Sequence, residues 1–442
     1  MAASVFDSAH LRGLFGDPEL SRLTGDSAEI RAMLIVEGAL AKVQGKLGVI
    51  PELSAAAIHR ATLEIQLDAG GLAAETAQNG VVIPALVSAF RKEMQAPEHA
   101  QYLHFGATSQ DIIDTAQALR LRQVIGIYRA RLSQVLSHLG ALANEHADTP
   151  MPARTWGQHA TPTTFGAICA AWGDPLLALL DDLERVEHGV AVVSLSGAAG
   201  TAGALGPKAA ETRAALAEAL SLRDPGHSWH SDRSGIAALG AWQTQVTAQI
   251  GKIGSDLTAL TQTELAEIHL GGAGASSTMP QKQNPVQPAV LVALAGHTAA
   301  LNTALQGAAV HQHQRDGAAW MTEWLSLPQM VIATGRALIG AAELMGTISP
   351  RADRMAKTMD LTQGLIHAEA LSFALCAAMP RPEAQAVSKE LCQQAMATET
   401  HLSKVVAERF PDMDMSAVFD VATQLGQAPD DAKSFATRVN SL

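Results

Sequence analysis

Alanine-rich stretches with a helical repeat of apolar residues are the feature that most constrains the fold of this 442-residue chain. They predict long helices at about residues 111–147, 163–193, 233–268 and 286–313, separated by short breaks that contain Gly and Pro. Roughly 30 residues make a helix about 45 Å long, at 1.5 Å per residue. Helices of that length are typical of an elongated bundle. The sequence therefore predicts an all-α protein.

Composition supports this fold class and bounds the number of domains. Aromatic residues, which favour strands, are only 4% of the chain, whereas alanine, the strongest helix former, is abundant throughout. With 48% hydrophobic and 17% charged residues, the composition is that of a globular protein. We expect three helical domains: an N-terminal one at residues 1–104, a central bundle with the active-site segments at 105–345, and a C-terminal one at 346–442.

Charge and cysteine content exclude several functional classes. A formal net charge of -12 gives no general basic surface for nucleic acid or anionic lipid, so a site for an acidic small molecule must gather its cations locally. The three cysteines (Cys169, Cys376 and Cys392) are widely spaced, which favours a reducing compartment. No Cys, His and Asp cluster has metal-ligand spacing, and no strand-linked Gly-rich loop is found. We expect neither a metal nor an organic cofactor.

The N-terminus and the most apolar stretch both argue against export or membrane insertion. No basic region followed by an apolar run begins the sequence, so we expect no secretory signal and a cytoplasmic protein. Residues 289–310 are the most apolar, but His297, Asn302 and Gln306 interrupt them. This pattern predicts a buried core helix rather than a transmembrane helix.

Three separate segments concentrate side chains suited to catalysis. The first, residues 102–111, precedes a helical pattern, and its Thr108 and Asp111 have the spacing of a capping box. A helix N-terminus there would also offer free N–H groups to a carboxylate, beside His104 and the hydroxyls of Thr108 and Ser109. This segment alone leaves both interpretations open.

The other two segments differ in how strongly they indicate function. In residues 154–162, Trp156 and His159 taken alone favour structural roles, as a core residue and a satisfied polar residue. Residues 271–285 are Gly-rich, carry two serines and then Lys282, and are predicted to form a mobile loop. Such a loop combines a proton carrier with a cation, so an ordinary connection explains it poorly.

Together the three segments resemble the fumarate lyase superfamily. Residues 271–285 resemble its G-S-S-x-M-P-x-K-x-N-P loop, and the other two resemble its H-x-G-x-T-S-x-D and R-T-H-x-Q-x-A regions, in family order. The similarity covers essentially the whole chain. The resemblance implies an all-α fold, a small polycarboxylate substrate, and a homotetramer in which three chains build each site.

The resemblance also implies roles for individual residues. In the family the first loop serine, here Ser276, removes a proton alpha to a carboxylate, and Lys282 matches the residue that stabilises the aci-carboxylate formed. We predict substrate contacts at further positions, most of which match contact positions of the family: His104, Thr108, Ser109, Thr155, Trp156, Gln158, His159, Asn284 and Arg315. His311 and His313 near Arg315 are two residues apart, a spacing that on a helix points them away from each other, so we predict no metal there.

Departures from the family pattern change the expected chemistry. Trp156 stands where most members carry the histidine that protonates the leaving group, and Ala289 where they carry the glutamate that orients it. Ala275 and Gln283 also depart from the loop pattern but remove no catalytic role. An amine or hydroxide needs a proton donor to leave, whereas opening a lactone releases a carboxylate, whose acid has a pKa of about 4. The joint loss of the histidine and the glutamate therefore favours lactone chemistry.

Three stretches resemble one branch of the superfamily, the bacterial 3-carboxy-cis,cis-muconate cycloisomerases: residues 39–51, 78–84 and 154–160. We therefore predict interconversion of 3-carboxy-cis,cis-muconate and 4-carboxymuconolactone through an enolate (aci-carboxylate). The reaction belongs to the protocatechuate branch of the β-ketoadipate pathway.

Two other functions are compatible with part of this pattern. One is a fumarate-releasing lyase that acts on an N- or O-substituted succinate, as adenylosuccinate lyase does, with its acid supplied by His104 or His159. The other is a non-catalytic structural relative. The retained Ser276, Lys282 and Asn284 disfavour that second alternative.

Overall fold

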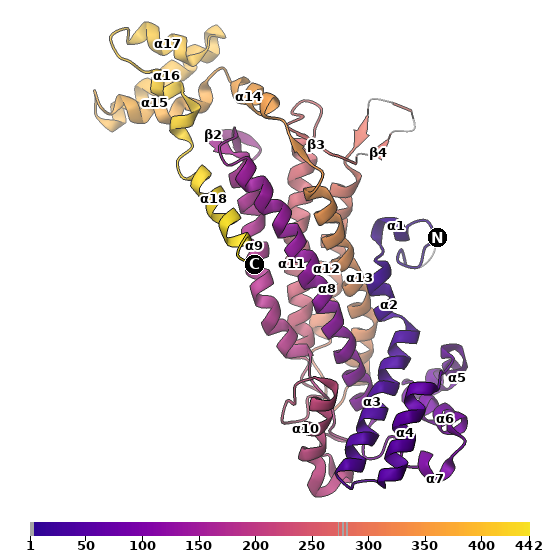
Figure 1. Cartoon of the computed structure of the whole chain (residues 1–442). Helices are drawn as coiled ribbons and strands as arrows, with labels where there is room; N and C mark the ends of the chain where they lie inside the picture. The colour runs from indigo at the N-terminus through magenta and orange to yellow at the C-terminus, as the bar shows by residue number, and fades with distance from the viewer. Residues whose placement is uncertain (1–3, 273, 276–277, 280–281) are drawn as a thin grey trace. The chain divides into compact units, whose positions relative to one another are not determined.

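Helices make up nearly all of the regular structure, as the sequence predicts (Figure 1). The computed structural model describes residues 4–272, 274–275, 278–279 and 282–442. Strands within these described residues form three two-stranded sheets: β1 (Pro150–Thr155) with β2 (Gln158–Thr164), β3 (Ile268–His269) with β6 (Ser349–Pro350), and β4 (Gly274–Ala275) with β5 (Gln283–Asn284). The all-α prediction is confirmed.

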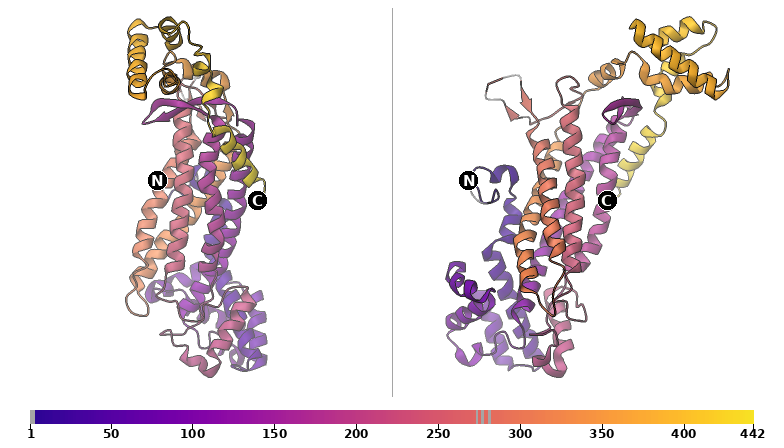
Figure 2. Two further views of the ribbon diagram at one scale, coloured as in Figure 1. Left: turned by 90° about the vertical axis from the view of Figure 1, so that its left-hand side faces the viewer. Right: turned by 180° about the vertical axis from the view of Figure 1, so that it is seen from behind.

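Five long helices lie side by side in the views of Figures 1 and 2. They are α8 (Ser109–Glu145), α9 (Phe165–Val190), α11 (Ser234–Leu260), α12 (Val286–Gly307) and α13 (Gly317–Met345). The predicted ends of α11 and α12, at 268 and 313, were wrong. The chain turns after Leu260 and reaches a positive φ of 49° at Ala266, and α12 stops at Gly307, a poor helix former.

The residues group into two compact units. Unit 1 comprises Met1–Arg131, Leu179–Ala248 and Ala293–Leu338, and unit 2 comprises Leu132–Ala178, Gln249–Val292 and Ile339–Leu442. Each of the five long helices contributes residues to both units. The division into domains at residues 104 and 345 stays a prediction.

Unit 1 packs the N-terminal helices with segments of the long helices. Its shorter helices are α1 (Arg12–Phe15), α2 (Pro18–Thr24), α3 (Asp26–Lys46), α4 (Glu52–Glu64), α5 (Ala69–Asn79), α6 (Ile83–Met94), α7 (Pro97–Ala100), η1 (Gly203–Lys208) and α10 (Ala209–Leu220). Tyr128 of α8 is fully buried and stacks on Trp242 of α11 with ring centroids 5.6 Å apart. Its hydroxyl donates to the carbonyl of Val331 in α13 over 2.8 Å. These contacts join three long helices, and the buried phenol hydroxyl has a hydrogen-bond acceptor.

Unit 2 holds the sheets, the other parts of the long helices and the C-terminal helices. These are α14 (Ala352–Asp360), η2 (Leu365–His367), α15 (Ala368–Leu375), α16 (Arg381–Thr398), α17 (Leu402–Arg409), η3 (Ser416–Phe419), η4 (Val421–Gln424) and α18 (Ala428–Val439). Helices α15 to α17 gather around their own apolar core, which includes Leu371, Leu391 and Val406 (Figure 2). Trp172 of α9 is buried and donates its Nε1–H to Asp256 of α11 over 2.7 Å.

Two of the described helices, α12 and α13, are long and apolar enough to cross a membrane by length and composition alone. In α13, 72% of the most apolar window is buried inside the chain, as in the core helix of a globular protein. In α12 only 33% is buried, so the prediction that this stretch is a buried core helix was wrong for the single chain. Much of the apolar surface of α12 is therefore exposed in the single chain.

Candidate active site

The first predicted segment forms the start of α8. The N–H of Thr108 donates to Oδ2 of Asp111 over 3.0 Å, which is the carboxylate half of a capping box. The same turn leaves Thr108 and Ser109 half-buried at the helix N-terminus, where N–H groups and the helix dipole favour an anion. The structural and the functional interpretation of this segment are therefore compatible.

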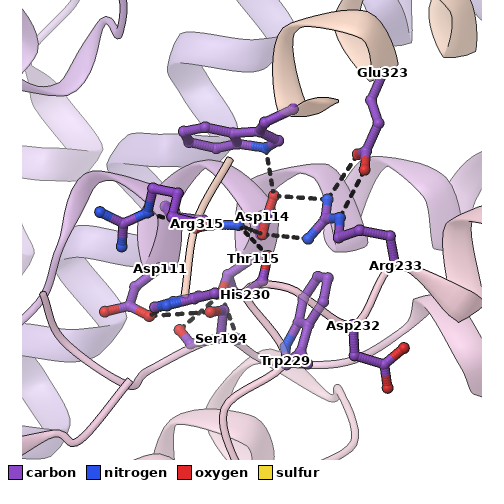
Figure 3. Close-up of polar contacts among 12 residues, drawn as sticks. Asp111, Asp114, Thr115, Ser194, Trp229, His230, Asp232, Arg233, Arg315 and Glu323 are labelled. Atoms are coloured by element: carbon purple, nitrogen blue, oxygen red, sulfur yellow. Dashed lines mark hydrogen bonds and ion pairs between the residues drawn. The ribbon is translucent and has the colours of Figure 1, made fainter. Parts of the chain in front are cut away.

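Asp111 does more than cap α8 (Figure 3). Its Oδ1 accepts the hydroxyl of Ser194 and the N–H of Ser196 and lies 2.8 Å from Nε2 of His230, and its Oδ2 also accepts the N–H of Gly197. Burial raises the pKa of Asp111, but the hydrogen bond and charge of His230, with the backbone donors, bring it below its ordinary value. A buried ionised carboxylate thus fixes the start of α8.

Arg315 lies beside this helix start. Its Nε donates to Oε1 of Gln110 over 2.7 Å, and its guanidinium also bonds the carbonyl of Ala198 over 3.3 Å. Arg315 belongs to the connection between α12 and α13, which is not helical. The prediction that placed His311 and His313 on a helix was therefore wrong, because α12 ends before them.

His104 is joined to a buried carboxylate. Its Nδ1 lies 2.6 Å from Oε1 of Glu37 on α3, and the Glu37 side chain is 0% exposed. Burial lowers the pKa of His104, but the charge and hydrogen bond of Glu37 outweigh it, and the pKa is raised above its ordinary value. The contact with Glu37 therefore favours the protonated form of the His104 ring.

A second buried charge cluster lies one turn further along α8 (Figure 3). The guanidinium of Arg233 bonds Asp114 and Glu323 over 2.7 Å each, and Trp320 donates its indole N–H to Asp114 over 3.3 Å. All three charged side chains are at most 1% exposed. One cation between two carboxylates links α8, the start of α11 and α13 within unit 1.

The second predicted segment forms the turn of the hairpin β1–β2. Thr155 pairs with Gln158, and between them Trp156 and Gly157 have positive φ angles of 55° and 75°. Two such residues in succession are typical of a type I′ turn. The Trp156 side chain is completely exposed, at 101%. The prediction that Trp156 belongs to the core was wrong, because the turn projects it away from the strands.

Arg154 and His159 lie next to the turn, one residue before Thr155 and one residue after Gln158. Arg154 donates to Oε1 of Glu267 over 2.8 Å, and Glu267 is fully buried. Burial lowers the pKa of His159, and the charge of Arg154 lowers it further. Among the described residues, none hydrogen-bonds Nδ1 of His159, which is buried. These surroundings favour the neutral form of His159, and its prediction as a satisfied polar residue was wrong for Nδ1.

The third predicted segment is described only in part. Strands β4 and β5 pair, Lys282 is exposed, and its N–H donates to the carbonyl of Met279 over 3.1 Å. Asn284 on β5 is half-buried. Ser276, the predicted catalytic serine, lies outside the described residues. Its role and the mobility of the segment stay predictions.

No group of three or more His, Cys, Asp or Glu side chains that could hold a metal ion occurs in the described part of the chain. The expectation that catalysis needs no metal or organic cofactor stays a prediction.

A profile of the lyase family matches residues 9–299. The chain belongs to this family. It is 36% identical over 413 residues to the 3-carboxy-cis,cis-muconate cycloisomerase of Pseudomonas putida, covering 92% of this chain and 97% of the relative. It is 33% identical to the nitrosuccinate lyase of Streptomyces davaonensis, covering 97% and 94%. The crystal structure of the 3-carboxy-cis,cis-muconate lactonizing enzyme from Pseudomonas putida matches with a TM-score of 0.92 and 33% identity, covering 98% of this chain and 100% of the other.

Membership of the lyase family confirms the resemblance seen in the three segments. Each unit holds its own part of the predicted site. Unit 1 contains His104, Thr108, Ser109 and Arg315, all near the start of α8, and unit 2 contains Thr155, Trp156, Gln158, His159, Lys282 and Asn284. Substrate contacts at these positions stay predictions.

The buried Glu37, His230 and Glu267, whose partners lie in the predicted segments, were not predicted from the sequence. For Glu37 a signal existed, because it is the one charged residue in the apolar run 33–41. A lone charge on a buried helix face has to meet a partner. For His230 and Glu267 no local pattern points to their partners, which are far away in the sequence.

Proposed function

We propose that the chain interconverts 3-carboxy-cis,cis-muconate and 4-carboxymuconolactone. The observation that carries this proposal is Trp156, on an exposed turn, at the position of the family's acid histidine, in a chain 36% identical to a cycloisomerase. Ala289 replaces the glutamate that would orient that histidine. A site without this acid suits a reaction in which the group that leaves or attacks is a carboxylate.

The proposed mechanism needs one proton transfer at carbon. In the lactonising direction an ionised carboxylate of the substrate attacks the conjugated alkene and forms the C–O bond. The alkene electron pair moves into a second carboxylate and produces the aci-carboxylate. Ser276 then gives its hydroxyl proton to the alpha carbon, and lactone opening reverses these steps. Lys282 and Asn284 stabilise the charge that develops on the aci-carboxylate.

Substrate carboxylates would be bound by two groups of side chains. In unit 1 the hydroxyls of Thr108 and Ser109 lie at the N-terminus of α8, near His104 and Arg315. In unit 2 the hairpin turn presents the exposed side chains of Thr155, Trp156 and Gln158, with His159 behind them. The first group supplies cations and N–H groups, and the second supplies amide, hydroxyl and ring surface.

We further propose a homotetramer in which three chains build each site. The exposed residues of α12 support this, because most of them are small and apolar, with Thr303 and Gln306 as the polar exceptions: Ala289, Val292, Ala293, Gly296, Ala299, Ala300, Ala304 and Gly307. Small side chains let helices of other copies approach closely, and closed symmetry is the usual arrangement of such copies. Sedimentation equilibrium should give the mass of four 46.2-kDa chains. A stable, fully active monomer would rule the tetramer out.

We also propose that the enzyme works in the cytoplasm, without a cofactor, in the protocatechuate branch of the β-ketoadipate pathway. Loss of activity with a chelator, restored by one particular metal, would contradict the cofactor-free part of this proposal.

Loss of the diene absorbance tests the central proposal. Purified protein should consume 3-carboxy-cis,cis-muconate and form 4-carboxymuconolactone. Nitrosuccinate is the matched alternative substrate, because the Streptomyces davaonensis relative is a nitrosuccinate lyase. Release of fumarate from nitrosuccinate or from a succinyl amine, without turnover of the muconate, would establish the lyase alternative instead.

A further inference from the structure

The carboxylate of Glu37 has one ionic partner among the described residues, and that partner is His104. Oε1 of Glu37 lies 2.6 Å from Nδ1 of the imidazole. Oε2 is buried and makes no hydrogen bond to any described residue. Burying a carboxylate with one oxygen that lacks a hydrogen bond costs free energy of folding. Such a residue is expected where its charge stabilises another group. Here the charge acts on His104.

The charged groups around His104 favour its protonated form. Glu37 faces it from α3 and Asp111 from α8, and both raise the pKa of His104. Arg91 of α6 faces it from the third side and lowers that pKa, as burial does. The two carboxylates outweigh burial and the guanidinium, so the ring carries a positive charge at a pH where an ordinary histidine has lost it.

The protonated ring borders a cavity of about 440 Å³ in unit 1. Its lining contains two cations, His104 and Arg91, and two hydroxyls, those of Ser88 and Ser109. The other lining residues are apolar: Ile83, Pro84, Val87 and Leu103. Ser109 is the first residue of α8, a 37-residue helix whose dipole adds positive potential at this end. No carboxylate is among the lining residues, so the cavity suits an anionic group.

The loop that carries His104 is held by the same face of α3. Gln44 lies seven residues after Glu37, two helical turns along, and its amide donates to the carbonyl of Phe105 over 2.7 Å. Arg91 donates to the carbonyl of Leu103 over 3.2 Å. His104 itself has a left-handed backbone with φ 65°, which a non-glycine residue adopts only where contacts enforce it. The ring therefore has a fixed orientation before any ligand arrives.

We propose that Glu37 is a positioning residue that keeps His104 an oriented imidazolium, so that its Nε2–H binds one carboxylate of the substrate at the start of α8. This inference rests on the proposed function, because it assigns a carboxylate subsite to the same active site. Glu37 acts through His104 and touches no reacting atom. Its removal should therefore weaken substrate binding more than it slows the chemical steps.

The kinetic test is Glu37→Gln, which keeps the shape of the side chain and removes its charge. We expect KM to rise about 10-fold at pH 8 while kcat changes less than about 3-fold, because the variant loses the charge that favours the protonated ring and with it an ionic contact to the substrate. The upper limb of the kcat/KM profile should move to lower pH. Unchanged KM and an unchanged profile would overturn the proposal.

Two control variants separate this role from a structural one. Glu29→Gln makes the same change two turns earlier on α3, where Glu29 pairs with Arg120 over 3.1 Å, and it should leave KM and the pH profile unchanged. His104→Gln should raise KM about as much as Glu37→Gln, and the double variant should add little, because the two residues act as one unit. Additive losses in the double variant would overturn the proposal.

A binding experiment separates failure of this inference from failure of the proposed function. The probe is tricarballylate, an unreactive tricarboxylate, titrated calorimetrically into the wild type and Glu37→Gln, with the His104 ring followed by NMR. We expect the ring of the wild type to titrate above that of Glu37→Gln, and tricarballylate to bind about 10-fold more weakly to the variant at pH 8. Equal ring titration and equal affinity in two folded proteins would overturn the inference, whether or not the muconate is turned over. If Glu37→Gln does not fold, His104→Gln replaces it in the calorimetry, and unchanged affinity has the same meaning.

Discussion

The predicted site residues of unit 1 and of unit 2 differ in what holds them. In unit 1, buried carboxylates reach His104 and the backbone of Thr108, and Arg315 is bonded to a buried glutamine. In unit 2, Trp156 is completely exposed on a two-residue turn. Lys282, in the third segment, is exposed as well.

The proposed substrate-binding residues thus comprise a group fixed by buried ionic contacts and an exposed group. Groups that bind anions benefit from a fixed geometry, which a buried ionic network supplies. Among the described residues, no buried ion pair holds the exposed tryptophan and lysine, and this is consistent with the proposed cover by other copies.

Ser276→Ala should lower kcat by a factor of about 10²–10⁴, typical of losing a positioned acid or base. KM should change little, because the groups of unit 1 still hold the substrate carboxylates. Lys282→Ala should damage kcat and KM together, since one cation serves both the bound substrate and the aci-carboxylate. Steady-state kinetics on the muconate measures both, and near-normal kcat in Ser276→Ala would refute the mechanism.

Asp111→Ala should lower the free energy of unfolding by about 3–5 kcal/mol, because it leaves three buried donors, the half-buried N–H of Thr108 and His230 without their acceptor. Glu75→Ala removes an exposed carboxylate on α5 and should change it by less than about 0.5 kcal/mol. Urea denaturation of both variants measures the difference. Equal small losses would mean that the start of α8 is not held as described.

Trp172→Ala and Trp156→Ala make the same change at a buried and at an exposed tryptophan of unit 2. The first should cost about 3–5 kcal/mol of unfolding free energy. The second should cost less than about 0.5 kcal/mol within the chain. A loss in Trp156→Ala that depends on protein concentration would locate this ring at an interface between copies. Equal losses that do not depend on concentration would contradict the exposed turn.

The stability contributed by Asp111 should depend on pH in the acid range. Its pKa in the folded chain lies below the ordinary 3.8, so the ionised form stabilises the fold. That contribution is complete above the ordinary pKa and is lost as the pH falls through the lower folded value. The difference in unfolding free energy between the wild type and Asp111→Asn should therefore shrink below about pH 4. A difference that grows on acidification would contradict an ionised Asp111.

The combined change Trp156→His and Ala289→Glu restores the family's acid pair and should not speed lactonisation. A carboxylate needs no acid to leave or to attack. The double variant and the wild type should differ in kcat by less than about 3-fold, measured on 3-carboxy-cis,cis-muconate. A large gain would overturn the argument from the leaving group.

The sequence determined the elements whose cause is local. Apolar periodicity predicted the all-α fold and four long helices to within a few residues at most of their ends, because a helix is stabilised by contacts three and four residues apart. The three motif segments predicted the family, since their order and spacing are visible in one dimension. The helix end at Gly307 was missed because the apolar pattern continues beyond it to Val310.

Tertiary structure alone decided which charges meet. Glu37 reaches His104 across 67 residues, and His230 reaches Asp111 across 119, so no window of sequence contains either pair. The exposure of Trp156 was also decided in three dimensions, because a tryptophan favours a core by its apolar area and only the type I′ turn projects it outward. Periodicity reports the face that a residue occupies, whereas its partner depends on how distant helices pack, and that packing places a buried carboxylate beside the histidine at the start of α8.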